Sequence, residues 1–402
     1  MIFFNAEKIR KDFPILEKNI IYLDSACMSL KPRCVIDKLE EYYKEYGACA
    51  GRSSHRLSER TGLEVQKARN IVRKFINAGS EKEILFTRNT TEGINLIANS
   101  LGLQKDDEVI IGDKEHNSNL IPWLKLKNTV GVKVVICKSN DDNTFNLDNF
   151  ENCFSKKTKL VSVVMTSNLD GVTNPVKEIV RISHDNNVLV LTDAAQAIPH
   201  KKIDVKALDV DFLAFSGHKM LGPTGIGVLY GKKELLEKLD QFIVGGETVT
   251  DSTYENYQQE KIPNRFEAGL QDYAGIVGLG EACNYLLKIG MNNIEEQEIK
   301  LNKIITDTLA HNEKIEIIGP KDAGKRGGIF CFNIKGMDPH HVARMTHASK
   351  NIMMRSGAHC VHSWFNAKKM KGSIRASFYL YNTEEEAKIF AEEIQKILKI
   401  AS

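Results

Sequence analysis

A lysine stands in a glycine-rich turn directly after an apolar run. Ser216-Gly217-His218-Lys219 follows Phe212-Leu213-Ala214-Phe215, and Gly222-Pro223-Thr224-Gly225-Ile226-Gly227 comes next. Open α/β sheets bind their ligands at the carboxyl ends of their strands, which is where this lysine would lie. The ordinary alternative is a solvated turn lysine. Lys219 is therefore a candidate active-site amine only if other residues that could take part in the same chemistry lie near it.

A carboxylate ends a second apolar run, Val188-Leu189-Val190-Leu191-Thr192-Asp193. An acid at a buried strand end is costly unless a cation pairs with it. The protonated pyridine nitrogen of pyridoxal phosphate (PLP) would be such a cation. A helix N-cap is the competing interpretation, because Asp is a good capping residue.

Two more polar groups follow strand ends. Thr90-Thr91-Glu92-Gly93 stands at a strand-to-helix junction, where hydroxyls and free backbone N–H groups can bind a phosphate. The same residues would also suit simple helix capping. His116 comes shortly after a strand that ends at Ile111. A lone histidine is commonly a plain polar or core residue, but beside a lysine, an aspartate and a phosphate cradle it could stack on a cofactor ring.

The elements that must position these groups alternate between short apolar strands and helices from about residue 65 to residue 235. We expect strands at 84–86, 108–111, 133–136, 159–164, 188–191, 212–215 and 227–230. Such alternation predicts an α/β fold with a mostly parallel sheet covered by helices on both faces. Helices dominate after about residue 260, with one strand at 328–334. The polar run Thr250–Gln259 is the candidate boundary between the two parts.

Composition excludes several classes of protein. The chain has 402 residues, 55 of them Lys or Arg and 52 Asp or Glu, so its net charge of +3 argues against a nucleic-acid binder. No uncharged apolar stretch is long enough to span a membrane. The apolar run at the start of the sequence is too short for the hydrophobic region of a secretory signal. The eight cysteines form no C-x-x-C pair and no zinc-ligand spacing. These features predict a soluble cytoplasmic protein with reduced thiols and no structural metal.

Ordered motifs along nearly the whole chain resemble one family. They are Tyr22-Leu23-Asp24-Ser25-Ala26, Thr90-Thr91-Glu92-Gly93-Ile94-Asn95-Leu96, Asn119-Leu120-Ile121-Pro122-Trp123, Ser167-Asn168, Asp193-Ala194-Ala195-Gln196-Ala197, Ser216-Gly217-His218-Lys219, Arg265-Phe266-Glu267-Ala268-Gly269 and Arg375-Ala376-Ser377. The chain resembles the class V aminotransferases, which are fold-type I PLP enzymes, and among them the cysteine desulfurases of the Suf type.

The resemblance implies a particular architecture. A large PLP-binding domain at 21–258 would contain a mostly parallel seven-stranded sheet between helices. A smaller α+β domain at 259–402 would carry a cysteine loop, and residues 1–20 would pack on it. The family also implies a homodimer, in which Arg265 and Gly269 would serve the neighbouring subunit's site.

The resemblance also implies residue roles. Lys219 would hold the cofactor and later move the substrate's α-proton, while Asp193 would pair with the pyridine nitrogen. The expected cofactor contacts are completed by Gln196 at the ring hydroxyl, His116 stacked on the ring, Asn168, and Thr90, Thr91, Ser216 and His218 around the phosphate. Arg375 and Asn168 would hold the substrate carboxylate, Arg375 through its planar, bidentate guanidinium group, and Arg355 would also contact the substrate. His116 would be the proton donor or acceptor near the leaving sulfur.

Cys360 distinguishes a desulfurase from other class V enzymes. It lies in Arg355-Ser356-Gly357-Ala358-His359-Cys360-Val361, where Arg355 and His359 would favour a reactive thiolate. The alternative is an inert cysteine. As the nucleophile, Cys360 would take sulfur from L-cysteine as a persulfide and release L-alanine. The short, ordered loop implies a sulfur-acceptor protein, with iron–sulfur cluster assembly as one destination.

Two alternatives stay open. The same cofactor could serve a selenocysteine lyase, a cysteine sulfinate desulfinase, or another class V lyase or aminotransferase. The chain could also be a non-catalytic scaffold or a sulfur-carrier partner that has kept the fold.

Three segments depart from the family pattern. Leu270-Gln271-Asp272 replaces the usual Thr-Pro-Asn, and Leu270 cannot donate the hydrogen bond by which that threonine reaches the partner subunit's cofactor. The usual histidine before Arg52 is missing. Val361-His362-Ser363-Trp364 follows Cys360 in place of a small residue and a proline.

Overall fold

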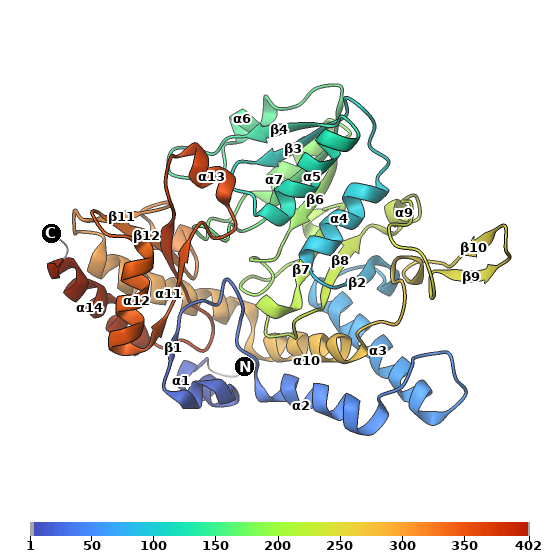
Figure 1. The fold of residues 1–402 in the computed structure, drawn as a ribbon, viewed down its shortest axis with the longest axis horizontal. Helices are drawn as coiled ribbons and strands as arrows, with labels where there is room; N and C mark the ends of the chain where they lie inside the picture. The colour runs from blue at the N-terminus through green and yellow to red at the C-terminus, as the bar shows by residue number, and fades with distance from the viewer. Residues whose placement is uncertain (1–3, 401–402) are drawn as a thin grey trace.

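A seven-stranded sheet forms the centre of the computed structural model, which describes residues 4–400 (Figure 1). The strand order is β2-β8-β7-β6-β5-β3-β4. The strands are β2 (Ile84–Thr87), β3 (Glu108–Gly112), β4 (Lys133–Cys137), β5 (Thr158–Val164), β6 (Leu189–Asp193), β7 (Phe212–Ser216) and β8 (Gly227–Gly231). Only β8 runs antiparallel to its neighbours, β2 and β7. The predicted mostly parallel sheet is confirmed, and each predicted strand of this sheet has its counterpart.

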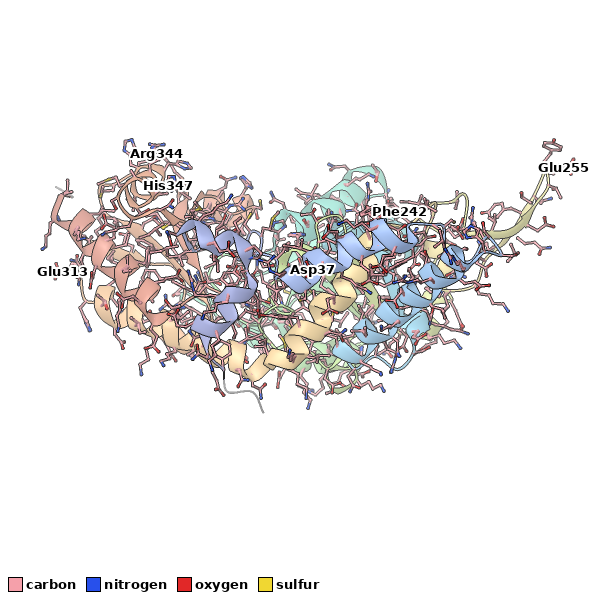
Figure 2. All side chains as sticks on the ribbon, turned by 90° about the horizontal axis from the view of Figure 1, so that it is seen from below. Asp37, Phe242, Glu255, Glu313, Arg344 and His347 are labelled. Atoms are coloured by element: carbon pink, nitrogen blue, oxygen red, sulfur yellow. The ribbon has the colours of Figure 1, made fainter. Side chains whose placement is uncertain are left out.

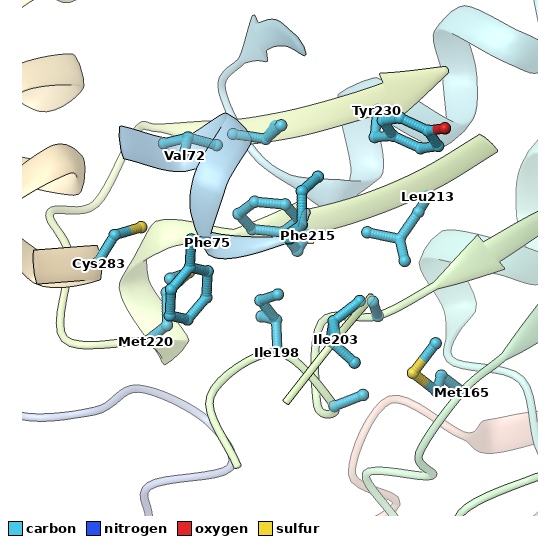
Figure 3. Packing of buried hydrophobic residues seen from close by; sticks show 14 of the residues in the cluster. Val72, Phe75, Met165, Ile198, Ile203, Leu213, Phe215, Met220, Tyr230 and Cys283 are labelled. Carbon is cyan, nitrogen blue, oxygen red and sulfur yellow. The ribbon is translucent and has the colours of Figure 1, made fainter. Parts of the chain in front are cut away.

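Helices cover both faces of this sheet. Alternate side chains of β7 point to opposite faces, so Leu213 and Phe215 join one hydrophobic cluster and Phe212 and Ala214 the other. The first cluster is packed by α3 (Arg56–Phe75), α7 (Val176–Asp185) and α10 (Tyr273–Ile289), and the second by α4 (Thr90–Ser100) and α5 (Asn117–Thr129). Figure 3 shows part of the first cluster, including Phe75 of α3 and Leu213 and Phe215 of β7. The carboxyl ends of the strands are thereby fixed.

A second, antiparallel sheet has the order β11-β12-β15-β14. Its strands are β11 (Ile315–Ile317), β12 (Ile329–Ile334), β14 (Arg355–Gly357) and β15 (Ser373–Ser377). Phe330 and Phe332 of β12 pack with Phe390 and Ile394 of α14 (Glu384–Ile400). The other helices near this sheet are α11 (Met291–Leu309), α12 (Pro339–Lys350) and α13 (His362–Ala367). The predicted strand at 328–334 is confirmed as β12.

The N-terminal residues contact helix α14 and strand β13 (Ile352–Met353), which lie near the second sheet. After α1 (Ala6–Ile9), Arg10 donates from Nη1 to Glu386 Oε1 at 2.7 Å. Further on, β1 (Ile21–Tyr22) pairs in parallel with β13. Helix α10 follows residue 258 in sequence, yet it packs on α2 (Arg33–Glu41) and α3 beside the first sheet (Figure 1). The division into segments 1–20, 21–258 and 259–402 stays a prediction.

The polar run at 250–259 forms a projecting hairpin. Strands β9 (Val249–Ser252) and β10 (Tyr257–Gln259) are antiparallel. The hairpin extends away from the body of the molecule, with Glu255 near its tip (Figure 2), and Tyr254 is fully exposed. Within residues 4–400, no helix has the length and apolar character needed to cross a membrane.

Candidate active site

A cavity of about 240 Å³ lies between the two sheets. Strand ends and helix starts of the first sheet line one side, and Arg355 and Arg375 of the second sheet line the other. The predicted site residues that line it are Thr90, Thr91, His116, Asn168, Asp193, Gln196, Ser216, His218, Lys219, Arg355 and Arg375. Cys360, the remaining predicted residue, contacts Arg355. The structure thus brings the whole predicted set together.

Asp193 and Lys219 come from the ends of the neighbouring strands β6 and β7. Asp193 is 3% exposed, and its Oδ1 accepts a hydrogen bond from Ala195 N at 2.9 Å. No helix begins after Asp193, because residues 195–200 form turns, so the N-cap interpretation is wrong. Burial raises the pKa of Asp193, against the pull of Lys219.

Lys219 ends the short turn at 217–219, which the buried Met220 anchors in the core (Figure 3). Burial lowers the pKa of Lys219, and Asp193 opposes the shift. A lowered pKa leaves more of the amine neutral, which is the form that reacts with a carbonyl.

Hydroxyl groups gather at the start of α4. Ser216 Oγ accepts from Thr90 N at 2.8 Å and lies 2.6 Å from Thr90 Oγ1. Thr91 Oγ1 lies 2.7 Å from Ser118 Oγ, at the start of α5. Gly227 permits the close approach of β8, since a Cβ there would lie 2.6 Å from Asn89 Cα. Helix N-termini carry partial positive charge, so these two starts form a suitable phosphate cradle.

His218 and His116 line the same cavity as neutral imidazoles. Burial lowers the pKa of His218 to about 4. Burial, with help from Lys219 and Arg355, lowers the pKa of His116 to about 3. His116 caps α5, and its Nδ1 accepts from Ser118 N at 3.0 Å. The proton of this neutral ring therefore lies on Nε2.

Arg375 is a fully buried cation held in one orientation. Its Nη1 donates to Asn168 O at 2.7 Å, and its Nη2 lies 3.3 Å from Asp24 Oδ1. Among the described residues, no partner is found for Arg375 Nε or Asn168 Oδ1. Asn168 itself donates from Nδ2 to His359 O at 2.7 Å. The guanidinium thus keeps hydrogen-bonding capacity for a carboxylate.

The loop at 357–361 presents Cys360 beside Arg355. Arg355 Nη2 donates to Cys360 Sγ at 3.5 Å, while Asn117 N donates to Cys360 O at 2.8 Å. His359 lies 2.9 Å from Ser373 Oγ through its Nε2, and burial lowers its pKa to about 2. The expectation that His359 assists the thiol is therefore wrong, because its neutral ring points toward Ser373.

The unusual residues after Cys360 anchor the loop. Val361 and Trp364 are buried against Leu169 and Ile329, and residues 362–367 form α13. Val361 and Trp364, which depart from the family pattern, thus hold the short loop in place by packing against the core.

Several site residues were not predicted. Asp24 orients Arg375, Ser118 joins the cradle, and Cys27 lines the cavity. Glu115 is buried and accepts from Asn119 Nδ2 and Val164 N, and burial raises its pKa to about 8. The motif that contains Asp24 was available as a signal, but its contacts lie more than 300 residues away in sequence.

These donors fit PLP. The buried carboxylate of Asp193 calls for a cationic partner, and Lys219 supplies an amine. The cradle suits a phosphate. Gln196 donates to Ala26 O at 2.5 Å, and no described residue satisfies its buried Oε1, which is left for a hydroxyl group.

Comparisons with known proteins agree with this geometry. The family model described as Aminotransferase class-V matches residues 21–390. A probable cysteine desulfurase of Halalkalibacterium halodurans is 41% identical over 98% of both chains, and one of Synechocystis is 40% identical over 99% of this chain and 96% of its own.

Solved structures give the same result. A cysteine desulfurase of Escherichia coli, described with an S-sulfonic acid, superposes with a TM-score of 0.93 at 31% identity, covering 100% of both chains. The apo cysteine desulfurase of Thermococcus onnurineus has a TM-score of 0.95 at 37% identity, covering 99% of both chains. The architecture is therefore that of the fold-type I class. The chain belongs to the aminotransferase class-V family, in which its similar relatives are cysteine desulfurases. Its assignment to the Suf type stays a prediction.

Proposed function

We propose that the protein is a PLP-dependent cysteine desulfurase, which converts L-cysteine to L-alanine and carries the sulfur on Cys360 as a persulfide. One observation carries the proposal: a thiol held by Arg355 stands beside a cavity that contains a buried amine and a buried carboxylate. Proteins that match this chain over nearly their whole length are named cysteine desulfurase or probable cysteine desulfurase.

The cofactor site would be organised by charge. When bound, PLP supplies an electron sink that stabilises negative charge at the substrate's α-carbon. Lys219 would hold it through the amine, and the Asp193 carboxylate would keep the ring nitrogen positive. The hydroxyls of Thr90, Thr91 and Ser216 and the neutral His218 would bind the phosphate.

The remaining residues would act on the substrate. Arg375 and Asn168 would bind its carboxylate, and Lys219 would move the proton at its α-carbon. Cys360 Sγ would attack the substrate sulfur, so that an S–S bond forms and the C–S bond breaks. The bonding electrons stay with the carbon skeleton, which becomes alanine after protonation. His116 would hold its Nε2 proton close to the departing sulfur.

Partners and location are further parts of the proposal. A homodimer agrees with the exposure of Leu270, which is 71% accessible in the single chain. Arg265 Nη2 donates to Leu236 O and Leu239 O of its own chain. This guanidinium nitrogen is therefore already engaged, and Arg265 would contribute to a neighbouring subunit's site through its backbone. A sulfur-acceptor protein would collect the persulfide in the cytoplasm, for iron–sulfur cluster assembly or a similar use.

The test compares the purified holoenzyme with Cys360→Ala and with Cys153→Ala, a cysteine outside the cavity. We expect a yellow wild-type protein that forms alanine and a persulfide from L-cysteine. Cys360→Ala should keep the colour and lose the persulfide, while Cys153→Ala should match the wild type. Lys219→Ala should lose all turnover.

Other outcomes would redirect the proposal. Cys360→Ala that still processes selenocysteine or cysteine sulfinate, with a wild type inactive on L-cysteine, would favour the lyase or desulfinase alternative. A protein that stays colourless after reconstitution with PLP would contradict the site itself.

A further inference from the structure

Two cysteines share one guanidinium group in the cavity wall. Arg355 Nη1 donates to Cys27 Sγ at 3.0 Å, and Arg355 Nη2 donates to Cys360 Sγ at 3.5 Å. The proposed function uses Cys360 and leaves Cys27 without a role. Among the residues that the structure describes, Cys27 is the cysteine that lines the cavity with Lys219. We call this group the Cys27–Arg355–Cys360 cluster.

Both sulfurs are held by well-anchored backbone. Cys27 follows β1 in a turn, where its N–H donates to Asp24 O at 3.0 Å, and the preceding residue Ala26 donates from N to Ser377 Oγ at 3.0 Å. Cys360 is tied to the start of α5 through the bond between its carbonyl and Asn117 N. The cluster therefore belongs to the framework of the site.

Three cationic side chains, Lys219, Arg355 and Arg375, line the cavity together with Cys27. A cation that contacts both sulfurs can stabilise negative charge on either one. Charge could thus move from one sulfur to the other without leaving the same guanidinium.

We propose, on the basis of the proposed function, that Cys27 is a second persulfide site, which receives its sulfur from Cys360. The Cys27 thiolate would attack the outer sulfur of the Cys360 persulfide. A new S–S bond forms at Cys27, the S–S bond at Cys360 breaks, and Cys360 leaves as a thiolate with the electron pair. The exchange is redox-neutral and needs no added oxidant or reductant.

This transfer regenerates the Cys360 thiolate while the first sulfur is still on the enzyme. A second molecule of L-cysteine can then react before any acceptor arrives. Each chain would store two sulfane sulfurs, and each would leave one alanine behind.

The experiment uses the holoenzyme with L-cysteine, without reductant or acceptor. The reaction is stopped by alkylation with iodoacetamide, persulfides are located by peptide mass spectrometry, and alanine is counted in parallel. We expect persulfides at both Cys27 and Cys360. Cys27→Ala should lower the alanine burst per chain about two-fold, whereas Cys153→Ala should leave it unchanged.

Alanine formed with persulfide confined to Cys360 would overturn the relay and leave the proposed function standing. A Cys27 persulfide that persists in Cys360→Ala would overturn both the relay and the role of Cys360 as the nucleophile. Absence of alanine and of any persulfide would instead overturn the proposed function, and the relay with it. Cys27→Ser, which has nearly the same shape, replaces Cys27→Ala if the alanine variant loses its cofactor colour, and the same lower burst is expected.

Discussion

At the scale of single residues, burial gives the active-site groups their ionisation states. The lysine, the aspartate and the imidazoles are all shifted toward their neutral forms by removal from water. For Asp193 the shift is reversible, because a cation placed opposite it would favour the carboxylate. Binding of PLP should therefore favour the charged form of Asp193, and the charged carboxylate should in turn strengthen the binding of PLP.

Asp193→Asn tests this dependence. The amide has the same shape but cannot pair with a positive ring nitrogen, so we expect PLP binding to weaken by about 2–5 kcal/mol. Titration of the apoprotein with PLP, followed by visible absorbance, measures the loss. The exposed Asp185→Asn is the control and should bind PLP as the wild type does. Equal affinity in the two variants would contradict the pairing.

The buried imidazoles predict how stability changes with pH. The pKa values of His116, His218 and His359 are lowered to about 3, about 4 and about 2. Below the ordinary value of about 6.5, the unfolded chain binds protons at these positions that the folded chain does not. Stability should therefore fall as pH decreases from about 6.5 toward 4, by up to about 1.4 kcal/mol per pH unit for each histidine.

Urea unfolding of the holoenzyme between pH 7.5 and 5 measures this slope. His359→Asn should make stability less dependent on pH, because one neutral buried imidazole is removed. His347→Asn, on the exposed side of α12, is the matched control and should leave the slope as it is (Figure 2). The same slope in both variants would rule out His359 as a contributor.

At the scale of elements, a buried ion pair joins α3, β2 and the segment before α10. Arg69 Nη1 and Nη2 donate to the two carboxylate oxygens of Glu267, each at 2.8 Å, and Phe86 N donates to Glu267 Oε1 at 2.7 Å. Both charged side chains are almost inaccessible to water. Removal of one partner would leave the other charge buried and unpaired.

Glu267→Ala should therefore lower the free energy of unfolding by about 3–5 kcal/mol. The exposed pair Arg181–Asp185 on α7 provides the comparison, and Asp185→Ala should cost about 1 kcal/mol or less. Urea denaturation of both variants gives the two values. Similar losses would show that burial does not determine the strength of the Glu267 pair.

The elements also show how far the sequence could predict this protein. Apolar runs such as Phe212–Phe215 revealed the strands of the first sheet, and Asp193 and Lys219 were found because they directly follow such runs. The two-residue strands β1 and β13 were missed, since Ile21–Tyr22 is too short to carry a pattern. The roles of Asp24 and Cys27 were missed for a different reason: each depends on a partner from the other end of the chain.

At the scale of the whole molecule, the proposed homodimer is expected to bury the exposed side chain of Leu270. Leu270 is 71% exposed, next to the Glu267 segment and close to Ile243, which is also exposed. Both residues line the same pocket. In the proposed homodimer, we expect this region to lie at the interface.

Leu270→Lys should weaken the dimer, because a charge would have to be buried on association. Light scattering with size-exclusion chromatography over a range of concentrations measures the mass. Ile400→Lys, a substitution of a similarly exposed residue near the end of α14, should leave the mass unchanged. A wild type that has the mass of one chain at all concentrations would contradict the homodimer.

The parallel pairing of β1 with β13 has a consequence for protein synthesis. A ribosome makes the turn that carries Cys27 at the beginning of translation, but β13, Arg355 and Arg375 emerge only near the end, on the order of tens of seconds later. A nascent chain that already contains Lys219 and Asp193 still lacks the guanidinium groups that close the cavity. We therefore expect chains that are truncated before β13 to form no persulfide from L-cysteine.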